Sequence, residues 1–110
     1  MTTREKGNIS EQKAVDFLET LFFEIVERNF YSRFGEIDII AKKDNIFHFI
    51  EVKSGKNFQS IYNVTPKKLQ KIIKTINFYI KKHNITFPYQ IDIITIDNGK
   101  IEFLENISMF

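Results

Sequence analysis

Two apolar stretches in the middle of the chain decide the fold: GEIDIIA at residues 35–41 and IFHFIEVK at residues 46–53. Both read as β-strands, whose side chains alternate between two faces. The short polar segment 42–45 lies between them, so we expect the two strands to pair as an antiparallel hairpin. With a period of two, Asp38 and Ile37 are predicted to lie on opposite faces of the first strand.

Before this hairpin the sequence predicts a helix and then a strand. In residues 8–22 the apolar side chains follow the i, i+3, i+4, i+7 spacing of one helix face. Asn8 followed by Glu11 fits a capping arrangement at the start of this helix, and Ser10 is the alternative N-cap. Residues 23–30 then read as the first strand of the sheet.

After the hairpin, residues 54–63 read as a loop that leads into a second helix. Thr65 and Pro66 match an N-cap and a first helical residue. Apolar residues between positions 69 and 80 recur at helical spacing and predict the buried face of this helix.

Two further strands are predicted near the C-terminus, at residues 89–96 and 100–104. The element order is then α-β-β-β-α-β-β. Because the helix between the third and fourth strands must cross a face of the sheet, we expect a mixed central sheet with helices packed on it, an α/β (α+β) fold. The length of 110 residues predicts that residues 1–110 form one domain.

Composition narrows the class of protein. Apolar residues make up 43% of the chain and charged residues 27%, which is typical of a globular domain. No apolar run exceeds three residues, so we expect no membrane-spanning segment, no signal peptide and a cytoplasmic location. The lack of cysteine and the presence of only two histidines argue against disulfides, thiol catalysis and a zinc site.

Charge is distributed unevenly along the chain. Residues 52–82 contain eight lysines and no acidic residue, whereas the segments on either side each carry a net charge of −3. Such a block predicts contact with a polyanion such as DNA; the alternative is that the lysines only solvate a helix. Lysines contact phosphates rather than bases, so recognition of nucleic-acid shape is expected. The predicted DNA-binding residues are Lys56, Lys67, Lys68, Lys71 and Lys74.

Acidic residues occupy both strands of the central hairpin. Asp38 lies between two isoleucines and Glu51 between Ile50 and Val52, where an ionised carboxylate is costly unless it is paired or bound to a metal ion. Antiparallel pairing brings Asp38 and Glu51 to the same end of the sheet, and Lys53 shares the face of Glu51. Two carboxylates and a lysine suit a Mg²⁺ ion that activates water at a phosphodiester. The alternative is an ion pair between Glu51 and Lys53, with Asp38 held by turn amides.

The same residues carry a resemblance to a known family. Residues 35–41 (GEIDIIA) and 49–53 (FIEVK) look like the GEIDLIA and FVEVK motifs of the YraN-like family, small bacterial proteins regarded as predicted endonucleases. Supporting matches lie in residues 7–18, 64–68 and 90–94. The family is placed in the PD-(D/E)xK superfamily and is related to archaeal Holliday-junction resolvases. The resemblance therefore implies a restriction-endonuclease-like fold and cleavage of branched or structured DNA.

The resemblance also implies roles for particular residues. Asp38 and Glu51 would bind Mg²⁺ or Mn²⁺ together with the backbone carbonyl of Val52, and Lys53 would position or deprotonate the attacking water. Glu11 would complete this catalytic and metal-binding set, directly or through water. The residues alone equally favour a capping role for Glu11.

Two departures from the family pattern bear on DNA binding. Ser10 stands where the family usually has glycine, and a Ser-Gly pair at 54–55 follows Lys53 where the family often has Thr-Arg. The alternative function is therefore a non-catalytic nucleic-acid-binding module that acts with a helicase or recombination partner, and a protein–protein adaptor is the second alternative. A homodimer is expected for a nuclease that cuts two strands, with residues 109–110 as a guess for its interface.

Other polar and aromatic residues are interpreted as structural. His48 shares a strand face with isoleucines and is expected to be a packed or hydrogen-bonded core residue. Asp92, in an apolar strand, is expected to have a structural role. Phe58 and Tyr62 could stack on bases, but ordinary packing is the expectation for both.

Overall fold

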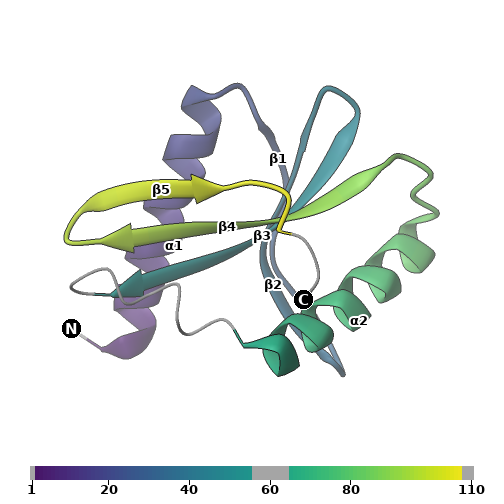
Figure 1. The fold of residues 1–110 in the computed structure, drawn as a ribbon, viewed down its shortest axis with the longest axis horizontal. Helices are drawn as coiled ribbons and strands as arrows, with labels where there is room; N and C mark the ends of the chain where they lie inside the picture. Colours follow the sequence, from purple (N-terminus) through teal and green to yellow (C-terminus); the bar gives the residue numbers. More distant parts are fainter. Residues whose placement is uncertain (1, 56–64, 108–110) are drawn as a thin grey trace.

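The computed structural model describes residues 2–55 and 65–107, and within these ranges it contains two helices and one five-stranded sheet (Figure 1). The α-β-β-β-α-β-β order is the predicted one. It defines a mixed α+β architecture that is compatible with a restriction-endonuclease-like fold. The helices are α1 (Thr3–Thr20) and α2 (Pro66–His83), and the strands are β1 (Glu24–Ser32), β2 (Gly35–Lys43), β3 (Ile46–Gly55), β4 (Tyr89–Asp97) and β5 (Lys100–Leu104).

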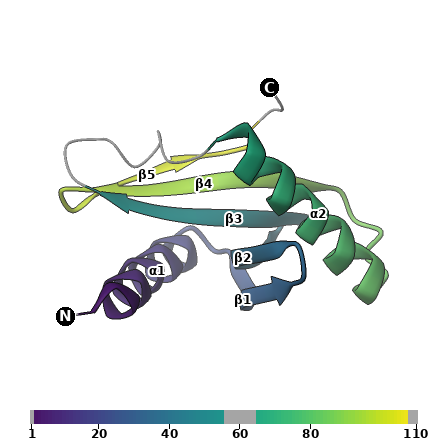
Figure 2. The same ribbon diagram turned by 90° about the horizontal axis from the view of Figure 1, so that it is seen from below.

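The sheet has the order β1-β2-β3-β4-β5, with β3 and β4 parallel and each other neighbouring pair antiparallel. α2 makes the crossover between the parallel strands. Figure 2 shows α1 and α2 on opposite faces of the sheet. Phe49 packs in one core with Ile76 of α2, and the next residue, Ile50, packs in the other core with Leu18 of α1. Alternate residues of β3 therefore belong to different cores.

α2 begins and ends as local sequence rules predict. The Thr65 hydroxyl accepts a hydrogen bond from the backbone N–H of Lys68, and Pro66 occupies the first helical position. Asn84 ends the helix in the left-handed conformation, with φ of 52°. Neither α2 nor α1 is long and apolar enough to cross a membrane.

The predicted start of α1 is wrong. The helix begins at Thr3, with Thr2 as its N-cap, and so Asn8 and Ser10 lie inside it. The Thr2 hydroxyl accepts a hydrogen bond from the backbone N–H of Glu5 and donates one to the Glu5 carboxylate. Thr2 and Glu5 form the same three-residue capping pattern as Asn8 and Glu11, and the earlier pair is the one used.

The alternation predicted for β2 also fails at one point. Ile37 packs in the α2 core with Ile40, whereas Ile39 packs in the α1 core. The neighbouring strand β1 is also irregular at this level, where Asn29 has a left-handed φ of 54°. Asn29 stands between the paired residues Arg28 and Phe30, and so it faces the position of β2 at which the alternation changes.

β3 is longer than predicted. Ser54 and Gly55, expected in a loop, continue the strand because they pair with Ile96 and Asp97 of β4. The predictions for Lys56, Phe58, Tyr62 and residues 109–110 lie outside the described residues.

Candidate functional site

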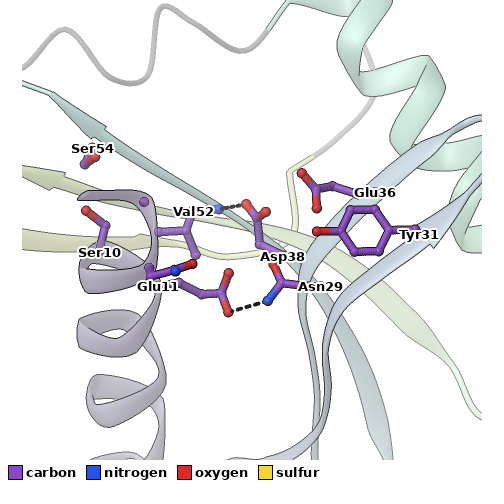
Figure 3. A pocket seen from close by; sticks show the side chains of 10 residues that line it. Ser10, Glu11, Asn29, Tyr31, Glu36, Asp38, Val52 and Ser54 are labelled. Atoms are coloured by element: carbon purple, nitrogen blue, oxygen red, sulfur yellow. Dashed lines mark hydrogen bonds between the residues drawn. The ribbon is translucent and has the colours of Figure 1, made fainter. Parts of the chain in front are cut away.

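β2 and β3 separate at the acidic residues. Their ladder runs from the pair Lys43 and Ile46 to the pair Ile39 and Ile50, so the next two facing positions are Asp38 and Glu51. There the Asp38 carboxylate accepts a hydrogen bond from the backbone N–H of Val52, with an N–O distance of 2.8 Å (Figure 3). At the point where the strands fork, the Asp38 side chain thus takes the place of a backbone carbonyl of β2 as the partner of the Val52 N–H.

The carboxyl groups of Asp38 and Glu51 are in hydrogen-bond contact. Burial raises the pKa of Glu51 to about 9, and the hydrogen bond to Asp38 and the negative charge of Asp38 act in the same direction. The ammonium group of Lys53 opposes this rise in pKa and is outweighed. The two acids therefore meet at one end of the hairpin, as antiparallel pairing predicts, and Glu51 holds a proton at neutral pH.

The alternative interpretation of these residues does not match their contacts. The ion pairs found among the described residues do not include one between Glu51 and Lys53. Asp38 is held by the amide of a strand residue, Val52, rather than by turn amides.

Glu11 reaches the site from α1 and is 7% exposed. Its Oε1 atom accepts hydrogen bonds from Nε of Arg28 at 2.9 Å and from Nδ2 of Asn29 at 3.0 Å. A second guanidinium nitrogen of Arg28 donates to Gln12 at 2.8 Å. The capping role considered for Glu11 is therefore wrong, because its partners belong to β1 rather than to its own helix.

Sequence reasoning missed Arg28 and Asn29. They are consecutive residues of a strand, which would normally point to opposite faces, yet both bind Glu11. The left-handed backbone of Asn29 makes this possible. The sequence signal that could have found them is Glu11, an acid on a helix face that needs a cation. This signal does not indicate which of the three arginines pairs with Glu11.

Two pockets open at the fork. One, of about 320 Å³, is called the acidic pocket; its lining includes Ser10, Glu11, Asn29, Tyr31, Glu36, Asp38, Val52 and Ser54 (Figure 3). The other, of about 150 Å³, is called the lysine pocket; its lining includes Gly35, Glu36, Glu51, Lys53, Lys68 and Lys71. The adjacent acids Asp38 and Glu51 thus lie between two openings of different charge.

Glu36 belongs to both pockets. Burial raises the pKa of Glu36, and the negative charges of Asp38 and Glu11 raise it further. The Tyr31 hydroxyl, by hydrogen bonding, and the Lys53 ammonium group both oppose this rise in pKa. The acidic pocket is consequently a region of crowded negative charge, which is the condition that a bound cation relieves.

The predicted DNA-binding lysines that the structure describes lie on α2. Lys68 and Lys71 line the lysine pocket together with Lys53, whereas Lys67 and Lys74 do not. All four of these predicted lysines are exposed. The charge block therefore starts beside the acids and continues along the helix.

A divalent cation would be held by few protein oxygens. Within residues 2–55 and 65–107 there is no group of three or more His, Cys, Asp or Glu side chains that could hold a metal ion. Asp38 and Glu51 offer two carboxyl groups in contact, and a cation would take the place of the proton on Glu51. Mg²⁺ usually keeps several waters and binds one or two carboxylates, so this donor pair fits it. Glu11 lines the same pocket as Asp38, but one of its oxygens is already bound by Arg28.

His48 and Asp92, the two buried polar residues that were interpreted as structural, bind each other. Nδ1 of His48 lies 2.6 Å from Oδ2 of Asp92. The other oxygen of Asp92 accepts hydrogen bonds from the Gln90 side chain and the backbone N–H of Asn106, both at 2.8 Å. His48 is thus a hydrogen-bonded core residue, and these contacts account for the buried Asp92.

The chain belongs to the uncharacterised protein family UPF0102, which matches residues 10–96. It is 53% identical over 109 residues to a UPF0102 protein of Helicobacter hepaticus, with 99% of each chain covered. It is 55% identical over 105 residues to one of Helicobacter pylori strain J99, covering 96% of this chain and 92% of that one. A UPF0102 protein of Aliarcobacter butzleri is 52% identical over 109 residues, covering 97% of this chain and 99% of that one.

These matches confirm the resemblance to YraN-like proteins at the level of the family. The names of the family and of these relatives state no biochemical activity. An assignment of function therefore depends on the site.

Proposed function

We propose that this protein is a Mg²⁺- or Mn²⁺-dependent endonuclease that hydrolyses phosphodiester bonds in branched or otherwise structured DNA. The observation that carries the proposal is the contact between the carboxyl groups of Asp38 and Glu51 at the fork of β2 and β3. Glu51 also lines the lysine pocket, together with Lys53 and two lysines of α2. Burial beside Asp38 disfavours the ionised form of Glu51, and a bound cation in place of the proton would relieve this cost.

Each residue has a part in the proposed reaction. Asp38 and Glu51 would hold the cation, with the backbone carbonyl of Val52 as a further oxygen donor. The bound cation would supply charge stabilisation at the phosphate and a more acidic water. Lys53 would orient the attacking water or accept its proton. Glu11 would act through its position in the acidic pocket, where Arg28 and Asn29 fix its carboxylate.

The test is cleavage of a labelled four-way DNA junction by the purified protein in Mg²⁺. We expect Asp38→Asn and Lys53→Ala to lose cleavage by roughly a hundredfold or more, since each removes a group that acts in the reaction. Lys13→Ala is the matched control, because Lys13 ends the other acid-x-Lys triplet of the chain and is exposed on α1. Equal cleavage by the wild type and the two site variants would overturn the proposal.

The proposed DNA cleavage also leads to expectations about the cellular location and the oligomeric state of the protein. The substrate is in the cytoplasm of a bacterial cell, and so a cytoplasmic location forms part of the proposal. Cutting both strands of a symmetric junction needs two sites, and a twofold homodimer would provide them.

A second function is a non-catalytic nucleic-acid-binding module that serves a helicase or recombination partner. Two observations favour it: Ser54 and Gly55, rather than an arginine, follow Lys53 along β3, and Glu11 is paired with Arg28. This function predicts salt-sensitive DNA binding with no cleavage under any combination of divalent metal and DNA structure.

A further inference from the structure

A third pocket lies away from the acids, between the β1–β2 turn and α2. Its volume of about 630 Å³ falls within the range of small-ligand pockets. Figures 1 and 2 both show this turn beside α2. We call it the aromatic pocket, and the residues that give it its chemistry are Arg33, Phe34, Lys74, Asn77, Phe78 and Lys81.

Close contacts hold the turn against α2. The Ser32 hydroxyl lies 3.2 Å from the hydroxyl of Thr75, which is fully buried. A Cβ atom at Gly35 would lie 3.5 Å from the same Thr75 oxygen, an ordinary van der Waals contact, so the start of β2 also lies close to α2. The approach brings Arg33 and Phe34 of the turn to the same pocket as Phe78 of α2.

Phe78 is a large apolar side chain that remains exposed. Its exposed fraction is 42%, whereas that of the next residue, Tyr79, is 3%. The Phe78 ring is supported by the buried Phe30 ring, with centroids 6.2 Å apart. An exposed aromatic ring that is backed by a second ring offers a surface on which a further flat ring can stack.

Three cations line the pocket together with these rings, and none of the described residues that line it is acidic. The guanidinium group of Arg33 lies 4.9 Å from the centre of the neighbouring phenyl ring. Lys74, Phe78 and Lys81 are spaced by four and three residues and so share one face of α2. The ion pairs found in the described part of the chain involve none of the three cations of this pocket.

We propose that the aromatic pocket binds one unpaired nucleotide of a single-stranded DNA segment, with the base stacked on Phe78 and the adjacent phosphates contacted by Arg33 and Lys81. A nucleotide joins a flat ring to a negative charge, which is the combination that this pocket complements. An acidic peptide supplies the charge without the ring. A duplex keeps its bases stacked on one another and cannot offer one to Phe78.

The position of the pocket connects it to the acids. Lys71 lines the lysine pocket and Lys74, one turn further along α2, lines the aromatic pocket. A strand whose phosphates follow these lysines would reach from the fork to Phe78. This connection rests on the proposed nuclease function, whereas binding of a base at Phe78 does not.

Tryptophan fluorescence tests the stacking directly, because the chain contains no tryptophan. Phe78→Trp places an indole in the pocket, and we expect its emission to be quenched by an oligothymidylate of about 15 nucleotides in EDTA. Phe87→Trp is the matched control: Phe87 is 41% exposed, and the Lys42 ammonium group lies 4.3 Å from its ring centre. Equal quenching at both positions, or none at Phe78→Trp, would overturn the inference.

Affinity gives a second measurement. By fluorescence anisotropy in EDTA, Phe78→Ala should bind the oligothymidylate at least about fivefold more weakly, the lower end of the effect of one stacked base. Phe87→Ala should keep the wild-type affinity, and an oligomer of abasic sugars should bind both variants equally. Wild-type affinity in a folded Phe78→Ala, or Phe78-dependent binding that is tighter for duplex than for single-stranded DNA, would contradict the proposal. If circular dichroism shows that Phe78→Ala is unfolded, the fluorescence result decides.

Cleavage is measured separately, so the two proposals can fail separately. If binding depends on Phe78 but the protein cleaves no DNA in Mg²⁺, the nucleotide pocket is supported and the nuclease function is contradicted. If the wild type cleaves DNA and Phe78→Ala binds the oligothymidylate as tightly as the wild type, only the proposal of a nucleotide pocket is contradicted.

Discussion

The acidic pocket and the lysine pocket open at the same fork, and they differ in how their charges are held. In the acidic pocket, Asp38 accepts a hydrogen bond from the Val52 amide, and Glu11 is bound by Arg28. These oxygens have fixed positions, which suits a small cation. In the lysine pocket, Lys71 is a long side chain on the exposed surface of α2, which suits an extended polyanion. At one fork, the oxygens of Asp38 and Glu11 thus have fixed positions, whereas the α2 lysines that would contact DNA are long and exposed.

The largest expected effect is stabilisation by Mg²⁺. A cation at about a hundred times its Kd stabilises the folded protein by about 2.7 kcal/mol. We therefore expect Mg²⁺ to raise the unfolding temperature of the wild type but not that of Asp38→Asn. Thermal denaturation measures the difference. Asp44→Asn is the control, since Asp44 is an exposed acid in the turn at the opposite end of the hairpin. Equal shifts in both variants would show that the acidic pocket does not hold the cation.

The next effect concerns the support of Glu11. Arg28→Ala leaves a buried carboxylate without its cation and should lower the free energy of unfolding by about 1–2 kcal/mol. The loss is smaller than for a fully buried pair because the Arg28 side chain is 36% exposed. Urea denaturation measures it, with the exposed Lys13→Ala as control. An Arg28→Ala protein as stable as the control would mean that the acids are not held rigidly.

A further effect on stability depends on pH. The pKa of Glu51 is about 9 in the folded protein and near 4.5, the ordinary value of a glutamate side chain, when the protein is unfolded. Between these values unfolding releases a proton, so stability falls as the pH rises from about 5 to 9. Glu51→Gln removes the titrating group and should therefore be more stable than the wild type at pH 8, by an amount that grows as the pH rises from about 5 to 9. The difference should vanish below pH 4.5. Thermal melts across this range test it; a difference that grows toward acid would reverse the sign and contradict the buried, protonated Glu51.

The smallest effect on stability is expected in the lysine pocket. Lys71→Ala should change the free energy of unfolding by less than about 0.5 kcal/mol, as for other exposed residues. It should reduce the slope of log K for DNA against log salt by about one, through the loss of one phosphate contact. Lys13→Ala on α1 should leave the slope unchanged. Equal slopes for both variants would contradict the assignment of DNA contacts to the lysine pocket.

The local sequence determined the order of helices and strands, and it determined that Asp38 and Glu51 lie close together. The capping pair Thr65 and Pro66 predicts α2, because the contacts involved lie within four residues. The tight hairpin predicts that Asp38 and Glu51 lie at the same end, because antiparallel register follows from the turn. At the start of α1 the same local rules misplaced the N-cap, since the chain offers two equivalent capping patterns.

Only the tertiary structure decided what surrounds those acids. Glu11 is separated from Arg28 by 17 positions, and their contact exists because α1 packs over β1 and a left-handed Asn29 turns two consecutive side chains toward it. The aromatic pocket likewise depends on the docking of a turn against α2, 43 positions away at the Ser32–Thr75 contact. Periodicity records which face a side chain takes within one element, whereas these contacts depend on how separate elements pack and on single residues that interrupt the period.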